Sequence, residues 1–291
     1  MKEVVVLSGK GGTGKTTIVG SLAALATNKL MVDCDVDAAD LYLLLSPTVR
    51  KETEFWSGQL AFIDEEKCTR CGLCQDVCRF NAIDDFRIDP VSCEGCGFCY
   101  NVCPEDAIIM KENLSGHWFI SDTRYGTLVH ARLGVAQENS GKLVAMVRQE
   151  AKRIAGEEGL DYIISDGPPG IGCPVISSLS GVDLAVIVTE PTMSGIHDLD
   201  RIIGLCHHFT IPVMVCINKY DINEEVARQI ERYCLSQGIE TTSRIPYDDV
   251  ATKALVKGLP VVEYTTNGIS QQIKMLWQDV AGTLERGKGE G

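Results

Sequence analysis

Two groups of closely spaced cysteines stand in the first half of the chain. Each has the spacing C-x₂-C-x₂-C-x₃-C, and the segment 68–83 recurs at 93–108. The eight cysteines are Cys68, Cys71, Cys74, Cys78, Cys93, Cys96, Cys99 and Cys103. Thiolates at such spacing either converge on metal or pair as disulfides, so one of these two chemistries is present twice.

The composition favours metal. With 27 basic and 40 acidic residues, the net charge of −13 argues against nucleic acid or an anionic membrane as a partner. The opening MKEVVVLSGKGG has too short an apolar run for a signal peptide, and no stretch approaches a membrane span. We therefore expect a cytoplasmic protein without stable membrane association. Disulfides are rare in that reducing compartment, which leaves iron–sulfur clusters or Cys₄ zinc sites.

A second chemical motif begins the chain. Residues 9–16, GKGGTGKT, fit the phosphate-loop pattern G-x-x-x-x-G-K-[ST] and follow an apolar strand. Glycines let backbone N–H groups converge on phosphate oxygens, Lys15 would reach the β and γ phosphates, and the Thr16 hydroxyl would ligate Mg²⁺. An ordinary glycine turn is the alternative.

The elements around these motifs predict an α/β fold. Strands are expected at 4–7, 30–33, 117–122, 127–133, 161–165, 184–189, 212–217 and 241–245, with helical patterns between them. This alternation predicts a mostly parallel sheet covered by helices on both faces. The cysteine repeat interrupts it, so we expect one α/β domain at 1–58 and 113–291 and an insert at 59–112.

The final helix, expected at 269–286, has one apolar stripe: Ile269, Ile273, Leu276, Val280 and Leu284. Docking on the core is the preferred interpretation, because the polar face lacks the lysine and arginine surplus of a membrane-surface helix. The four cysteines in apolar or helical contexts, Cys34, Cys206, Cys216 and Cys234, are expected in the core.

The N-terminal motif resembles the deviant phosphate-loop ATPases of the MinD/ParA class, whose KGGxGKT motif matches residues 10–16. Relatives of that class include Mrp-type iron–sulfur carriers and the nitrogenase iron protein. The resemblance implies an ATP-dependent homodimer in which Lys10 touches the partner's ATP. It also implies that Asp35, in VDCDVDAADL, orients the attacking water, with Asp33 and Asp37 as solvated neighbours. Asp166, in DGPPG, would sense the γ-phosphate and Mg²⁺.

The same resemblance implies which residues bind ATP. The adenine-binding positions of the class correspond here to Asn218, Pro246 and Asp248, although short polar residues after strands are common. The full nucleotide-binding set is Gly11, Gly12, Thr13, Gly14, Lys15, Thr16, Thr17, Asn218, Pro246 and Asp248.

The cysteine spacing resembles that of bacterial two-cluster ferredoxins, in which the fourth cysteine of each group ligates the other group's cluster. The resemblance implies that the insert at 59–112 is a small α+β ferredoxin-like domain with two [4Fe–4S] clusters. Cluster one would use Cys68, Cys71, Cys74 and Cys103, and cluster two would use Cys93, Cys96, Cys99 and Cys78. The proline that usually follows the fourth cysteine is present at Pro104 but replaced by Arg79.

Cys173 lies seven residues after Asp166, the offset at which the nitrogenase iron protein has a ligand of its shared interfacial cluster. No second cysteine occurs near 130–140. A shared metal site at Cys173 is therefore a hypothesis, with a buried or redox-inert switch cysteine as the alternative.

These motifs predict an ATPase whose nucleotide cycle is coupled to metal-cluster assembly or to electron delivery, with a metal-cluster or redox acceptor as partner. The alternative is an ATP-gated reductase. A spatial-positioning ATPase is disfavoured by the non-basic terminal helix.

Overall fold

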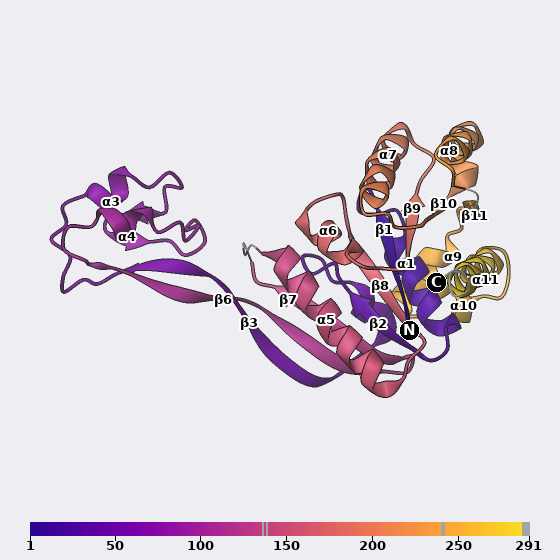
Figure 1. The fold of residues 1–291 in the computed structure, drawn as a ribbon, viewed down its shortest axis with the longest axis horizontal. Helices are drawn as coiled ribbons and strands as arrows, with labels where there is room; N and C mark the ends of the chain where they lie inside the picture. Colours follow the sequence, from indigo (N-terminus) through magenta and orange to yellow (C-terminus); the bar gives the residue numbers. More distant parts are fainter. Residues whose placement is uncertain (136, 138, 240–241, 287–291) are drawn as a thin grey trace. The chain divides into compact units, whose positions relative to one another are not determined.

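The computed structural model describes residues 1–135, 137, 139–239 and 242–286 (Figure 1). Residue 241, where a strand was expected to begin, and the tail 287–291 lie outside this part. The chain divides into two compact units, and they are treated separately below. Unit 1 comprises Met1–Glu52, Trp118–Ala131 and Ser140–Gly291, whereas unit 2 comprises Thr53–His117 and Arg132–Asn139.

The main sheet has the strand order β11-β10-β9-β1-β8-β2-β7-β6-β3. Its strands are β1 (Lys2–Ser8), β2 (Lys29–Asp33), β3 (Thr48–Ile63), β6 (Ile108–Thr123), β7 (Gly126–Leu133), β8 (Tyr162–Pro169), β9 (Leu184–Thr189), β10 (Val213–Asn218) and β11 (Thr242–Ile245). Among the described residues, six strand pairings are parallel: β1 with β8 and β9, β10 with β9 and β11, and β2 with β7 and β8. The expected α/β class with a mostly parallel sheet is confirmed.

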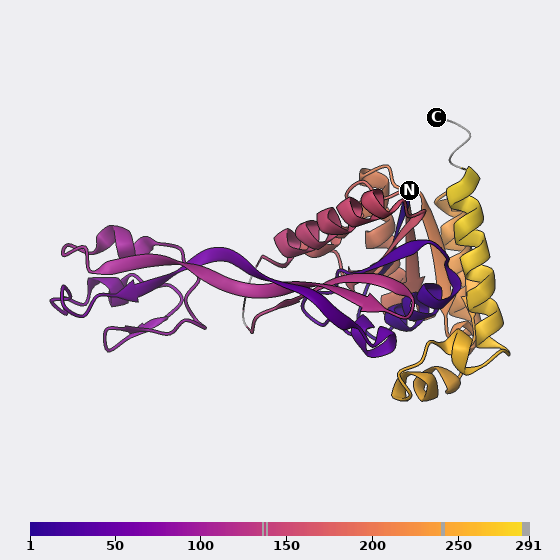
Figure 2. The same cartoon turned by 90° about the horizontal axis from the view of Figure 1, so that it is seen from below.

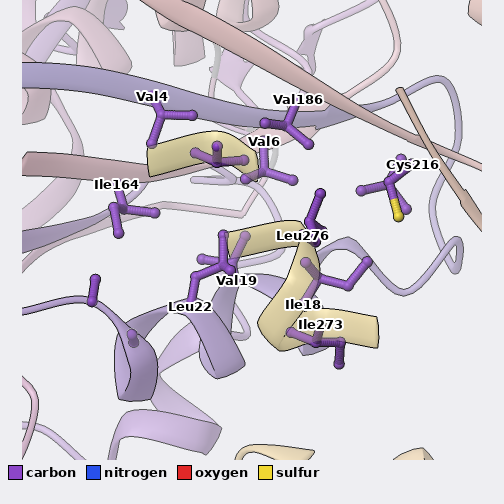
Figure 3. Close-up of a cluster of buried hydrophobic side chains, with 14 of the residues drawn as sticks. Val4, Val6, Ile18, Val19, Leu22, Ile164, Val186, Cys216, Ile273 and Leu276 are labelled. Atoms are coloured by element: carbon purple, nitrogen blue, oxygen red, sulfur yellow. The ribbon is translucent and has the colours of Figure 1, made fainter. Parts of the chain in front are cut away.

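Both faces of the sheet are buried, which explains the unbroken apolar run in β1. Val4 and Val6 join one core cluster, whereas Val5 and Leu7 join the other, because successive side chains of a strand point to opposite faces. Figure 3 shows part of the first cluster, where Val4 and Val6 lie near Val19 and Leu22.

Helices cover each face (Figures 1 and 2). The first face carries α1 (Lys15–Leu25), α2 (Leu41–Leu45), α9 (Val250–Val256), α10 (Val261–Tyr264) and α11 (Ile269–Arg286). The second carries α5 (Ser140–Glu158), α6 (Cys173–Leu179), α7 (Met193–His208) and α8 (Glu224–Ser236), with a short 3₁₀ helix η1 at Tyr220–Ile222. On this second face Arg148 of α5 pairs with Glu3 of β1, with 2.6 Å between Nη2 and Oε1.

The apolar stripe of α11 is buried in the first cluster, as expected. Cys34, Cys206, Cys216 and Cys234 are also buried, which confirms them as core residues. No helix in the described ranges is both long enough and apolar enough to cross a membrane.

Unit 2 holds the cysteine repeat. It contains α3 (Leu73–Asp76), α4 (Phe98–Val102) and an antiparallel pair of short strands, β4 (Ile83–Asp84) and β5 (Arg87–Ile88). The expected insert boundaries at 58/59 and 112/113 fall inside β3 and β6, each of which is 16 residues long. β3 was not foreseen, because most of its side chains are exposed and it shows no hydrophobic period.

Candidate functional site

The phosphate loop joins β1 to α1. Gly12 and Gly14 adopt φ values of 81° and 87°, in the left-handed region that glycine enters without steric cost. Gly14 is also the N-cap of α1 and has no side chain to cap it. The first amides of the helix therefore point toward the loop, where an anionic phosphate is favoured by the helix dipole. Thr16 and Thr17 lie half-buried in the first turn.

Lys15 and two aspartates come together at this point. The Nζ atom of Lys15 lies 2.5 Å from Oδ1 of Asp166 and 3.9 Å from Oδ2 of Asp35. Burial alone would lower the pKa of Lys15, but the charge of Asp166 and its hydrogen bond raise the pKa above its ordinary value. Burial, reinforced by Asp166 and only partly offset by Lys15, raises the pKa of Asp35 to about 6. The structure thus gathers the lysine and both predicted aspartates at one end of the sheet.

Asp33 corrects one expectation. It is 1 % exposed rather than solvated, and its carboxylate accepts backbone hydrogen bonds from Asp35 N at 3.1 Å and Leu41 N at 3.2 Å. Burial and the nearby Asp166 raise its pKa well above the ordinary value. Asp33 therefore holds the backbone that presents Asp35, whereas Asp37 is exposed as expected. The sequence did not distinguish the two.

A hollow beside the phosphate loop gathers the residues expected to bind adenine. Its lining includes Gly12, Gly14 and Thr17 from the loop side, and Asn218, Pro246 and Asp248 from the far strands. Asn218 donates from Nδ2 to the carbonyl oxygen of Thr13 at 2.7 Å. A Cβ at Gly14 would lie 2.4 Å from that Nδ2, so only glycine allows this close approach.

Lys10 is partly exposed and makes contacts within its own chain. Its Nζ lies 3.7 Å from Oε2 of Glu190 and 3.4 Å from Oγ of Ser194. Glu190 also pairs with Lys219, which donates to the carbonyl oxygen of Gly12 at 3.4 Å. Sequence reasoning missed Glu190 and Lys219. The only signal was that each follows the end of a strand, β9 or β10.

In unit 2 the eight repeated cysteines line two separate hollows. One is lined by Cys68, Cys71, Cys74 and Cys103, and the other by Cys78, Cys93, Cys96 and Cys99. Each hollow thus combines three cysteines of one group with the fourth of the other. Tertiary structure brings these groups together although 25 residues separate equivalent positions.

The two crossing cysteines have matching surroundings. Cys78 Sγ accepts a hydrogen bond from Ala82 N at 3.4 Å, and Cys103 Sγ accepts one from Ala107 N at 3.3 Å. Burial raises the pKa of Cys74 and of Cys99, which favours their neutral thiols until a cation binds. Within the described ranges, no three cysteine, histidine or acidic side chains converge as a single-ion site requires.

Cys173 is exposed at the first residue of α6, so the alternative of a buried cysteine is wrong. It packs next to Gly141, where an added Cβ would lie 3.2 Å from Cys173 Cβ. It lines neither of the two cysteine hollows.

Comparison with protein families gives one match over most of the chain. The family described as the CobQ/CobB/MinD/ParA nucleotide-binding domain matches residues 4–261. An uncharacterized protein of Methanocaldococcus jannaschii is 34% identical over 279 residues, covering 95% of both chains. An iron–sulfur cluster carrier protein of Pyrococcus horikoshii is 25% identical over 163 residues, covering 50% of this chain and 55% of its own length.

Among solved structures, the septum site-determining protein MinD of Pyrococcus horikoshii, complexed with Mg-ADP, is similar in fold. Its TM-score is 0.58 at 18% identity, with 96% of this chain and 95% of that chain covered. At this identity the likeness concerns the fold of the sheet and its helices.

Proposed function

Because the chain belongs to the CobQ/CobB/MinD/ParA nucleotide-binding family and is an ATPase of the MinD/ParA type, we propose that its ATP cycle is coupled to two [4Fe–4S] clusters held by the cysteine repeat. The cycle would deliver electrons or metal clusters to an acceptor protein. The supporting observation is the pair of hollows in unit 2, each lined by four cysteines in the crossed combination.

The cysteine arrangement fits a cubane better than zinc. In a cubane each thiolate binds a different iron, so the ligand sulfurs stand farther apart than around one tetrahedral zinc ion. The described cysteines line hollows without meeting at single-ion spacing. Cluster one would be held by Cys68, Cys71, Cys74 and Cys103, and cluster two by Cys93, Cys96, Cys99 and Cys78. The backbone donors of Ala82 and Ala107 would stabilise the crossing thiolates.

ATP hydrolysis by this chain would depend on positioning and charge neutralisation, since phosphoryl transfer needs little covalent work from the protein. Lys15 and the amides at the start of α1 would hold the phosphates. Thr16 and Asp166 would hold Mg²⁺, and Asp35 would orient the attacking water. Removing the Lys15 ammonium would also leave Asp166, which is 1 % exposed, without its cation.

We place the active form as a homodimer with ATP, in which Lys10 reaches the partner's nucleotide. In the described structure Lys10 is 38% exposed, so its side chain is accessible for such a contact. Lys10→Ala is expected to lower ATP hydrolysis sharply while nucleotide binding by the monomer remains.

When bound, the clusters would supply reversible one-electron transfer. Electron delivery is favoured by the complete set of four thiolates in each hollow, which leaves no open ligand position. Cluster delivery is favoured by the Pyrococcus relative named an iron–sulfur cluster carrier protein, whose similarity covers half of this chain. Mixing the reduced protein with candidate acceptors, with and without ATP, distinguishes electron delivery from cluster delivery. ATP-dependent electron flow supports electron delivery, and transfer of labelled iron supports cluster delivery.

The cluster assignment is tested by iron analysis of anaerobically purified protein. We expect about eight irons per chain, two clusters of four. The double variant Cys78→Ala/Cys93→Ala should retain about four, because both residues serve cluster two. Cys103→Ala/Cys93→Ala should lose both clusters. Thr69→Ala, which lines the first hollow without offering a sulfur, is the control. Equal iron loss in the two double variants would refute the crossed arrangement, and zinc in place of iron would refute the clusters.

The Cys173 hypothesis has its own test. If Cys173 holds a metal site shared across the dimer, Cys173→Ala should lower the iron content of the ATP-bound dimer without changing that of the monomer. Unchanged iron and unchanged activity in the dimer would reduce Cys173 to an exposed cysteine without a metal role.

A further inference from the structure

Glu190 is a largely buried carboxylate that lies between two lysines of the nucleotide site. Its side chain is 15% exposed, whereas Lys10 and Lys219 are 38% and 30% exposed. One carboxylate oxygen contacts Lys219, and the other lies 3.7 Å from Lys10 Nζ. The two lysines therefore share one counter-ion.

The backbone around Glu190 fixes this carboxylate. Its carbonyl oxygen accepts a hydrogen bond from Thr192 N at 2.8 Å. The same oxygen would lie 2.3 Å from a Cβ placed at Gly195, so the turn from β9 into α7 packs tightly. The start of the phosphate loop packs against the same helix, since a Cβ at Gly9 would lie 2.1 Å from Asp198 Cβ. Glu190 therefore has little freedom to follow a departing lysine.

The two lysine contacts differ in strength. Lys219 makes the closer contact and also donates to the Gly12 carbonyl oxygen, and its backbone N donates to Asn218 Oδ1 at 3.0 Å. Lys10 makes the longer, more exposed contact and one further bond to Ser194 Oγ at 3.4 Å. Because a buried carboxylate without a cation is strongly destabilising, Glu190 can release Lys10 only if Lys219 stays.

We propose that Glu190 is a positioning residue that holds Lys10 within its own protomer until the ATP-bound dimer forms. Lys219 then compensates the charge of Glu190, so that Lys10 is free to reach the partner's nucleotide. Glu190 thereby sets the concentration at which the dimer assembles. The inference rests on the proposed ATP-dependent dimer.

The test measures the dimer dissociation constant of the full chain by sedimentation with a non-hydrolysable ATP analogue and Mg²⁺. Glu190→Gln removes the charge that retains Lys10. In each protomer the Glu190–Lys10 contact is lost, and a partly exposed ion pair changes an equilibrium constant about threefold. A dimer contains two such contacts, so its dissociation constant should fall about tenfold. Ser194→Ala removes the second Lys10 contact without touching Lys219, so it should also lower the dimer dissociation constant. Glu263→Gln removes an equal charge from the Arg124 pair and should leave the dimer dissociation constant unchanged.

A purely structural role for Glu190 predicts a different pattern. It would lower the melting temperature and the ADP affinity of the monomer, both measured on the same samples, without tightening the dimer. An unchanged or weaker dimer in both Glu190→Gln and Ser194→Ala would overturn the inference. If the unaltered chain does not dimerise with the analogue, the proposed ATP-dependent dimer itself fails.

Discussion

Replacing Asp35 by asparagine should make the nucleotide-free protein more stable and less active. Burial, together with the charge of Asp166, raises the pKa of Asp35 from its ordinary value near 3.8 to about 6. A carboxyl group with a raised pKa in the folded state binds protons more readily there than in the unfolded state, so its contribution to stability falls as the pH rises. The difference between a pKa of 3.8 and one of about 6 corresponds to ~3 kcal/mol of free energy of unfolding, because a tenfold change in a binding constant is worth about 1.4 kcal/mol.

The stability gain of Asp35→Asn should therefore be about 3 kcal/mol at pH 8, above the folded-state pKa, and should fall to about 0.5 kcal/mol near pH 4. Urea unfolding of the nucleotide-free chain at a series of pH values measures it. Asp37→Asn, which removes an exposed carboxylate from the same segment, is the matched control. ATP hydrolysis by Asp35→Asn should fall about 100-fold or more, the typical contribution of a residue that manages the attacking group. We argue that the ionised Asp35 carboxylate destabilises the folded chain but is needed for ATP hydrolysis. A variant that is no more stable than the unaltered chain at pH 8, or whose stability gain does not depend on pH, would refute this argument.

Two further predictions follow from close contacts. Asn218→Ala removes the buried hydrogen bond to the Thr13 carbonyl oxygen. This should weaken ADP binding by about 1–2 kcal/mol, which is roughly a 5- to 30-fold change in affinity measured by titration calorimetry. Unchanged affinity would show that the phosphate loop keeps its conformation without Asn218. Gly95→Ala places a Cβ 1.9 Å from the Gln59 carbonyl oxygen, whereas Gly97→Ala meets nothing within 4 Å, although both glycines have positive φ. The first should disrupt unit 2 and lower the iron content that we propose for it. The second should cost only about 1 kcal/mol of backbone strain, and equal iron loss in both variants would contradict the steric argument.

The sequence by itself determined the features whose chemistry lies in neighbouring residues. The phosphate loop, the cysteine spacing, the apolar strands and the stripe on α11 each depend on residues a few positions apart, and local geometry makes such patterns readable. The α/β class followed, because alternating buried strands and helices have few stable arrangements.

Only the tertiary structure decided the rest. Asp33 and Asp37 look alike in VDCDVDAADL, yet Asp33 ends a strand inside the sheet and Asp37 lies in solvent. Glu190 and Lys219 meet Lys10 because parallel strands bring their carboxyl ends to one edge, across separations of up to 209 positions between Lys10 and Lys219. The mostly exposed β3 left no periodic signal, because its structure depends on strand pairing more than on burial of its own side chains. Contacts of this kind arise from the packing of segments that lie far apart in the sequence, so no local sequence pattern predicts them.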